Sequence, residues 1–151
     1  MLRSDCNRGV SGIDGSTSTA AGAACVGEEM TVLITGDMSF SYDVNGLSST
    51  YLSPRFKIIV MCNGGGGIFR FIKPTSDLPE LETCFEIHRD ISVEKYADLF
   101  GLRYFELNDE KSAAEVLSLF FAEKDRPAIL AVHTPNVYNA EVLRGYFRRS
   151  R

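Results

Sequence analysis

An acid and an amide each follow a short apolar run of the sequence, and both are residue types that bind hard metal ions. Asp37 follows the run at residues 31–35 after a single glycine, Gly36, and Asn63 follows the run at residues 57–62. The two positions lie 26 residues apart, which is enough for a helix to return the chain to a second, parallel strand. The glycine run 64–67 allows backbone groups to approach a ligand closely. A carboxylate, neutral oxygens and phosphate oxygens complete an octahedron around Mg²⁺, so we predict a metal–diphosphate site at two strand ends.

Each of these residues also has an ordinary structural role that the residues alone leave open. Asp37 or Ser39 could cap the following helix, because acids and serines commonly accept backbone N–H bonds at a helix start. Asn63 could belong to a simple turn after a strand. Within the glycine run, the Asn-x-Gly spacing selects Gly65 as the residue that offers a carbonyl ligand.

Strand-like and helix-like segments alternate along the chain, which predicts an α/β fold with a parallel sheet and helices on both faces. We expect strands at residues 31–35, 56–61, 103–107 and 127–133, and helices at 16–25, 41–52, 93–100, 112–124 and 136–149. Residues 64–89 show weak helical periodicity and contain two prolines, so we expect a long, mobile loop. The last helix carries an apolar stripe, made of Tyr138, Val142, Leu143, Tyr146 and Phe147.

The expected helix starts have candidate caps. Asp14 or Ser16 could cap the first helix, and Ser92 the helix at 93–100. Ser112 and Glu115 have the spacing of a capping box for the helix at 112–124.

Composition excludes several classes of protein. The chain has 151 residues, enough for one domain, and its formal charge of −4 argues against nucleic-acid or anionic-membrane partners. No apolar run has the roughly 18–20 residues that a membrane helix needs. The four cysteines are widely spaced and form neither a disulfide framework nor a zinc motif, which favours free thiols and a cytoplasmic location. We expect His88 and His133 to be structural or exposed to solvent.

The sequence around Asp37 and Asn63 resembles the thiamine diphosphate (ThDP) motif. The flanking residues narrow the resemblance to the 2-succinyl-5-enolpyruvyl-6-hydroxy-3-cyclohexene-1-carboxylate (SEPHCHC) synthase family of menaquinone biosynthesis. The matching stretches are residues 7–15 (NRGVSGIDG), 36–47 (GDMSFSYDVNGL) and 65–69 (GGGIF). Met38 stands where the wider motif has glycine, and a bulky apolar residue there is typical of this family. The resemblance covers residues 7–151, the family's ThDP diphosphate-binding domain, and leaves residues 1–6 as a short leader or an artificial boundary.

The resemblance implies a role for each matching residue. The metal, Mg²⁺ or Mn²⁺, is expected to bind to Asp37, Asn63 and Gly65. The cofactor, ThDP, is expected to contact Ser11, Ile13, Asp37, Met38, Ser39, Asn63, Gly65 and Ile68. In relatives, the residue at Ile13 props the cofactor in a bent shape, although a plain core isoleucine is an alternative. Substrate-binding roles fall to Arg8, Ile68, Phe69 and Ile72; Arg8 could instead be solvated, and the apolar residues could belong to the core.

The resemblance also implies that something is missing. ThDP enzymes use a glutamate from a separate pyrimidine-binding domain, and no glutamate here, including Glu28, Glu29, Glu82 and Glu86, has a matching context. We therefore expect a fragment of a larger transferase that is inactive alone, self-associates, and works on 2-oxoglutarate and isochorismate within its parent. The alternatives are a domain of an acetolactate-synthase-like enzyme or a 2-oxo acid decarboxylase, a non-catalytic α/β assembly module, and a small subunit that pairs with a separate pyrimidine-binding chain.

Overall fold

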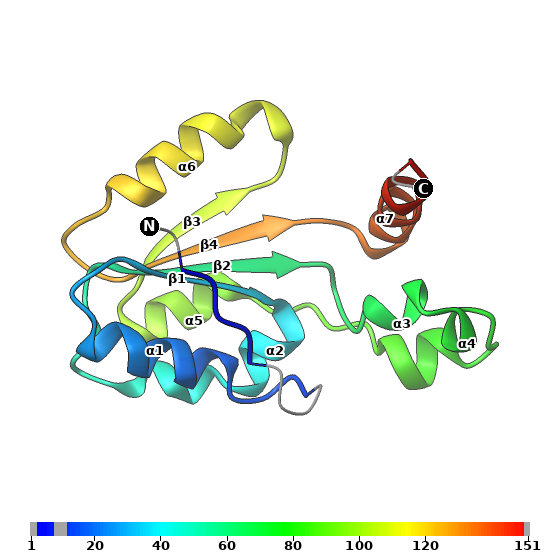
Figure 1. Ribbon diagram of the computed structural model, residues 1–151, viewed down its shortest axis with the longest axis horizontal. Helices are drawn as coiled ribbons and strands as arrows, with labels where there is room; N and C mark the ends of the chain where they lie inside the picture. The colour runs from blue at the N-terminus through cyan, green and yellow to red at the C-terminus, as the bar shows by residue number, and fades with distance from the viewer. Residues whose placement is uncertain (1–2, 8–11, 150–151) are drawn as a thin grey trace.

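Four parallel strands form the centre of the molecule in a computed structural model that describes residues 3–7 and 12–149. The strands are β1 (Thr31–Gly36), β2 (Phe56–Cys62), β3 (Arg103–Leu107) and β4 (Ala128–His133), in the order β1-β2-β4-β3. The register pairs Gly36 of β1 with Met61 of β2, and Cys62 of β2 with His133 of β4. The residues that follow β1, β2 and β4 therefore lie together at the carboxyl ends of the strands, the side called the sheet edge below; the outer strands β1 and β3 are called edge strands (Figure 1).

Helices α1 (Ser16–Val26), α2 (Asp37–Tyr42) and α5 (Val93–Phe100) lie on one face of the sheet (Figure 1). The small side chains of Ala21 and Ala24 are buried and let α1 lie close to β1. The main core lies under these helices and includes Phe40, Phe56 and Ile58, each fully enclosed.

Helix α6 (Ala113–Ala122) covers the other face over β3 and β4 (Figure 1). Its Phe120 packs with Ala128 and Leu130 in a second, smaller core. Lys57 of β2 is also fully enclosed, and its Nζ donates to the carbonyl of Glu123 at 2.6 Å. At the edge strand β1 this face is open, since 69% of Ile34 is exposed. Helices thus cover both faces, as predicted, but the α6 face only in part.

A group of helices lies beyond the ends of the strands (Figure 1). It contains α3 (Ile68–Phe71), α4 (Lys73–Ser76), the π-helical segment η2 (Leu81–Glu86) and the last helix α7 (Asn136–Arg149). The prediction of a long loop at 64–89 is wrong in one respect, because short helical segments form within it, and Pro74 occupies the first turn of α4.

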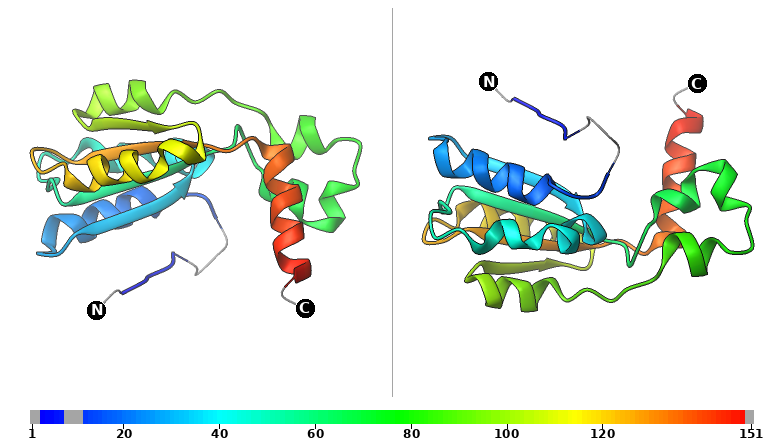
Figure 2. Two further views of the ribbon diagram at one scale, coloured as in Figure 1. Left: turned by 90° about the horizontal axis from the view of Figure 1, so that it is seen from above. Right: turned by 90° about the horizontal axis from the view of Figure 1, so that it is seen from below.

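The last helix α7 packs against α3 and stands apart from the sheet (Figure 2). Its predicted apolar stripe is largely open to solvent, with Tyr146 68% exposed and Val142 53% exposed. Within the described residues, Phe147 contacts Phe71 of α3, with the ring centroids 6.0 Å apart.

The predicted helix at 41–52 is wrong, because α2 ends at Tyr42 and a separate 3-10 turn η1 (Val44–Ser48) follows. The interruption falls at Asp43, whose carboxylate accepts bonds from the backbone N–H of Ser18 at 2.8 Å and from its hydroxyl. Asp43 thus caps α1 from a distance, where we predicted Asp14 or Ser16. A Cβ on Gly46 would lie 2.6 Å from the Cα of Ser18, so only glycine permits this approach.

The other two predicted caps have different outcomes. Ser92 caps α5 as predicted, since its hydroxyl accepts from the N–H of Lys95 at 3.3 Å. The capping box at Ser112 does not form. Instead, the Asp109 carboxylate accepts from the N–H groups of Lys111 and Ser112, and the turn η3 (Glu110–Ser112) leads into α6.

Neither disulfides nor membrane-spanning helices occur in the described parts of the chain. Cys6, Cys25, Cys62 and Cys84 are all free thiols. None of the described helices combines the length and the apolar character that crossing a bilayer requires.

Candidate functional site

Asp37 lies where β1 ends and α2 begins, and its side chain is only 3% exposed. One carboxylate oxygen, Oδ1, accepts the N–H of Met38 at 2.8 Å. The other, Oδ2, accepts the N–H of Gly64 at 2.7 Å, across the gap to the end of β2. A direct hydrogen bond thus joins the two stretches that the sequence selects, and each carboxylate oxygen retains a lone pair for a further ligand.

Asn63 follows β2 and is half-buried beside the glycine run 64–67, which we call the glycine loop. Its Oδ1 accepts the N–H of Gly65 at 3.3 Å, and the Gly65 carbonyl accepts the N–H of Gly67 at 2.9 Å. Both oxygens that the sequence selects as metal ligands therefore already take part in turns of the glycine loop.

Close packing within the chain explains why residue 65 is glycine, and this packing cannot be seen in the sequence. Gly65 is buried with φ +154°, and a Cβ there would lie 2.5 Å from the carbonyl oxygen of Glu86. The close neighbour of this glycine is thus the chain's own segment at the end of η2.

Ser39 joins the first loop to the strand ends. Its hydroxyl donates to the backbone carbonyl of Ile13 at 2.7 Å, which holds the loop before α1 beside α2. Ile13 itself is 45% exposed, so its side chain is open to a ligand and is not core. Arg8 and Ser11, the other candidates on this loop, lie outside the described residues.

The candidate apolar residues after the glycine loop have different surroundings. Ile68 at the start of α3 is 58% exposed, and Ile72 just after α3 is 42% exposed. Phe69 is half-buried and packs against Phe85, with the ring centroids 5.6 Å apart. Ile68 and Ile72 are open to a ligand, while Phe69 is only partly open and also supports the segment that leads to Glu86.

Titratable groups lie along the same edge of the sheet. Burial, with the nearby Asp37 carboxylate, raises the pKa of the Cys62 thiol to about 11. On β3 and β4, Glu106 Oε1 accepts the Tyr104 hydroxyl at 3.1 Å and lies 3.0 Å from Nε2 of His133. A hydrogen bond from Asn108 is the largest cause that lowers the pKa of Glu106; burial opposes it, and Tyr104 and His133 add smaller lowering effects. His133 is thus partnered at the sheet edge, as a structural histidine is expected to be.

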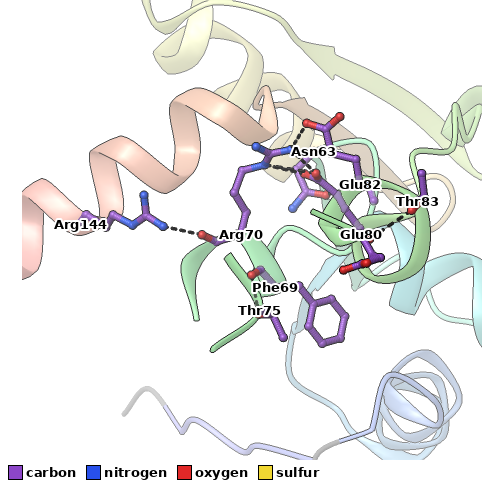
Figure 3. A network of polar contacts seen from close by, with 10 residues as sticks. Asn63, Phe69, Arg70, Thr75, Glu80, Glu82, Thr83 and Arg144 are labelled. Carbon is purple, nitrogen blue, oxygen red and sulfur yellow. Dashed lines mark hydrogen bonds and ion pairs between the residues drawn. The ribbon is translucent and has the colours of Figure 1, made fainter. Parts of the chain in front are cut away.

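An ion-pair cluster next to the glycine loop was missed by the sequence analysis. Arg70 of α3 contacts the carboxylates of Glu86 and Glu82, as Figure 3 shows in part. These hydrogen bonds, first that to Glu86, raise the pKa of Arg70. The partners lie 12 and 16 positions away in a stretch with weak periodicity, so no local sequence signal pairs them.

The donor set at the strand ends suits a divalent ion that also binds phosphate. Within residues 3–7 and 12–149, no group of three or more His, Cys, Asp or Glu side chains is placed to hold a metal. The site offers one buried carboxylate together with amide and carbonyl oxygens, which are hard, mostly neutral ligands. Such a set fits Mg²⁺ or Mn²⁺ whose remaining positions are filled by diphosphate and water.

Known proteins resemble this chain over most of its length. The chain is 49% identical over 141 residues to the SEPHCHC synthase of Porphyromonas gingivalis, covering 93% of this chain and 24% of the relative. It is 45% identical over 143 residues to the SEPHCHC synthase of Flavobacterium johnsoniae, covering 95% and 26%. The chain thus spans about a quarter of the length of these relatives.

A solved structure shares the fold. It is the thiamine diphosphate-dependent 4-hydroxybenzoylformate decarboxylase of Rhodococcus jostii RHA1, with a TM-score of 0.60 at 22% identity, over 77% of this chain and 22% of that one. The family model of the thiamine pyrophosphate enzyme C-terminal TPP-binding domain matches residues 4–132. The chain therefore belongs to the family of C-terminal TPP-binding domains of thiamine pyrophosphate enzymes.

Proposed function

We propose that this chain is the metal- and diphosphate-binding domain of a SEPHCHC synthase. The observation that carries the proposal is the 2.7 Å hydrogen bond from Gly64 N–H to Asp37 Oδ2, because it joins the acid at the end of β1 to the residue that follows Asn63 at the end of β2. The identity of 41–49% to three SEPHCHC synthases supports the choice among ThDP enzymes.

The chain's own residues bind and orient the cofactor in this proposal. Asp37, Asn63 and the Gly65 carbonyl hold Mg²⁺ or Mn²⁺, and the backbone at Met38 and Ser39 faces the diphosphate. Burial of Asp37 keeps its carboxylate in one orientation, so little ordering is left for binding to impose. When bound, ThDP supplies a carbon nucleophile for 2-oxo acids, which is chemistry that protein side chains lack.

The other candidate residues surround the reacting end of the cofactor. Ile13, with Ser11 on the same loop, supports the aminopyrimidine side. Ile68, Phe69 and Ile72 give the substrate an apolar wall. Arg8 binds a substrate carboxylate through its guanidinium fork, which suits dianionic substrates.

The parent reaction proposed here is the joining of 2-oxoglutarate to isochorismate with loss of CO₂, a step of menaquinone biosynthesis. The activating glutamate is expected on a pyrimidine-binding domain of the same or a second subunit, in a self-associating cytoplasmic enzyme. We expect the 151-residue chain alone to consume no 2-oxoglutarate. Turnover by the isolated chain would contradict this part of the proposal.

Cofactor binding is tested by NMR titration, which detects weak complexes of a 16.7 kDa chain. Adding ThDP with Mg²⁺ should shift the backbone amides of residues 37–39 and 63–66 in a saturable way, and EDTA should reverse the shifts. Asp37→Ala should abolish them. The matched control is Asp125→Ala, which removes an exposed acid just before β4, at the amino-terminal ends of the strands and away from the candidate site.

Two results would overturn the proposal. One is a wild-type chain whose amides do not move at millimolar ThDP and Mg²⁺. The other is a response that Asp37→Ala leaves unchanged, as a non-catalytic assembly module would give. A full-length parent that turns over pyruvate and not 2-oxoglutarate with isochorismate would instead assign the domain to an acetolactate-synthase-like enzyme.

A further inference from the structure

The glycine loop, residues 64–67, is held against residues 85–89 by backbone contacts on both of its sides. Gly66 N–H donates to the carbonyl of Glu86 at 2.7 Å, and Arg89 N–H donates to the carbonyl of Gly64 at 3.0 Å. A Cβ on Gly66 would lie 2.8 Å from the carbonyl oxygen of Phe85, so the backbones of the two segments are in direct contact. The conformation of the glycine loop therefore depends on where residues 85–89 lie.

The side chain of Glu86 fixes that segment to the helix that follows the glycine loop. Glu86 is only 5% exposed, and the side chain of its partner Arg70, on α3, is 19% exposed. Nε of Arg70 lies 3.1 and 3.2 Å from the two carboxylate oxygens of Glu86, and Nη2 also contacts Oε2. Nη2 further donates to Glu82 Oε1 at 2.9 Å, at the other end of η2. The guanidinium thus binds both ends of η2 in one planar fork.

Arg70 is itself held from the opposite side. Its backbone carbonyl accepts Nη2 of Arg144, from α7, at 2.6 Å (Figure 3). The preceding carbonyl, that of Phe69, accepts the hydroxyl of Thr75 at 2.6 Å. Helix α3 therefore cannot move without disturbing contacts to both α4 and α7.

These contacts close a ring around the glycine loop. From Gly66 the ring passes to the Glu86 backbone, through the Glu86 and Arg70 side chains, and back along α3. A run of glycines has more backbone freedom than any other sequence, so its conformation must be imposed by its surroundings. An ion pair that is largely shielded from water is directional and weakly screened by salt, which suits this task.

We propose that Arg70 and Glu86 are positioning residues, which hold the glycine loop in the shape that brings Gly64 to Asp37 and sets the Asn63 amide for the metal. This inference rests on the proposed function for its consequence in cofactor binding, but the positioning itself can be measured without any ligand.

The test compares Arg70→Gln with Arg103→Gln in the 151-residue chain. Arg103 also pairs with a glutamate, Glu123, at 3.0 Å, but at the start of β3, away from the glycine loop. In Arg70→Gln, we expect the amides of Gly64 and Gly66 to lose protection from hydrogen exchange in ligand-free protein. The affinity for ThDP with Mg²⁺ should fall by roughly 10- to 100-fold, as when groups that orient metal ligands are removed. Arg103→Gln should leave both quantities at the wild-type level.

Two further variants keep the test decisive if Arg70→Gln fails to fold. Arg70→Lys keeps the charge but loses the planar fork, and should give a smaller loss of protection. The double variant Arg70→Gln, Glu86→Gln leaves only the exposed Glu82 without its arginine partner and no charge at the buried Glu86 position, and should still loosen the glycine loop. Wild-type protection of Gly64 and Gly66 in any folded variant that changes Arg70 would overturn the proposal. If wild type binds no ThDP, the proposed function fails, while the exchange data still decide the role of Arg70 and Glu86.

Discussion

Replacing Gly65 by alanine tests whether the glycine loop is shaped by the chain or by a ligand. The φ of Gly65, +154°, lies in a region that side chains rarely adopt, and the new Cβ would meet the Glu86 carbonyl oxygen at 2.5 Å. Relief of that contact requires residues 85–88 to move away, which breaks the hydrogen bond from Gly66 N–H to Glu86. We therefore expect Gly65→Ala to be destabilising without any cofactor present.

The expected cost has two parts. A sparsely populated backbone conformation costs of order 1–3 kcal/mol in a residue with a side chain. The lost hydrogen bond adds about 0.5–1.5 kcal/mol. Together these predict a loss of about 1.5–4.5 kcal/mol in the free energy of unfolding. At about 2–4 °C per kcal/mol for a domain of this size, Tm should fall by roughly 3–18 °C.

The assay is urea unfolding followed by far-UV circular dichroism, with Gly22→Ala as the matched control. Gly22 lies inside α1, and a Cβ there would meet nothing within 4 Å. This control should be stabilised by about 0.5–1 kcal/mol, because alanine is the better helix former. If Gly65→Ala unfolds within about 0.5 kcal/mol of wild type, a change typical of neutral surface substitutions, the reasoning about the glycine loop is refuted.

Three further substitutions or modifications test other parts of the structure. Asp43→Ala should lower the free energy of unfolding by about 1–2 kcal/mol, because α1 loses its cap; a thermal melt indistinguishable from wild type would contradict this. Burial lowers the pKa of Lys57 below its ordinary value of 10.5, against the opposing charge of Glu123. Between the lowered pKa and 10.5 the Lys57 side chain therefore binds fewer protons in the folded chain than in the unfolded chain, and its contribution to stability rises with pH. Lys57→Met should remove this contribution, so that the slope of stability against pH in urea unfolding at alkaline pH becomes less positive than in wild type; an unchanged slope would refute it. The Cys62 thiol, with its pKa raised to about 11, should react with iodoacetamide at about pH 8 more slowly than exposed Cys84, and equal rates by mass spectrometry would contradict the burial.

Most of the fold could be predicted because burial of whole strands leaves a strong local pattern. The four predicted strands match β1, β2, β3 and β4 to within about a residue at each end. The wrong prediction at 41–52 has a tertiary cause, since Asp43 turns away from its own helix to cap α1. Periodicity cannot reveal a partner that lies 25 residues earlier.

The last helix shows a second limit of sequence patterns. The sequence predicted the apolar stripe of α7, but the pattern of apolar residues does not identify the surface against which the stripe packs. In the structure, Tyr146 and Val142 remain exposed while Phe147 contacts α3.

Only some residues of the candidate site could be selected from the sequence. Asp37 and Asn63 could be selected because they follow β1 and β2, and parallel pairing brings the carboxyl ends of neighbouring strands together. Arg70 and Glu86 could not, because neither belongs to a regular pattern and their pairing depends on the folding of η2 and α3. The sequence excluded Glu86 as the activating glutamate but gave no sign of the buried ion pair in which it lies.

The open side of β1 has a practical consequence for handling this chain. Val32 and Ile34 project from an edge strand, 42% and 69% exposed, beside backbone groups that have a hydrogen-bonded neighbour on one side only. Such a strand is a template for intermolecular β-pairing during overexpression and storage. A lysine in place of Ile34 would act as a gatekeeper against inclusion bodies, and it would do so on the face of the sheet away from Asp37 and its neighbours.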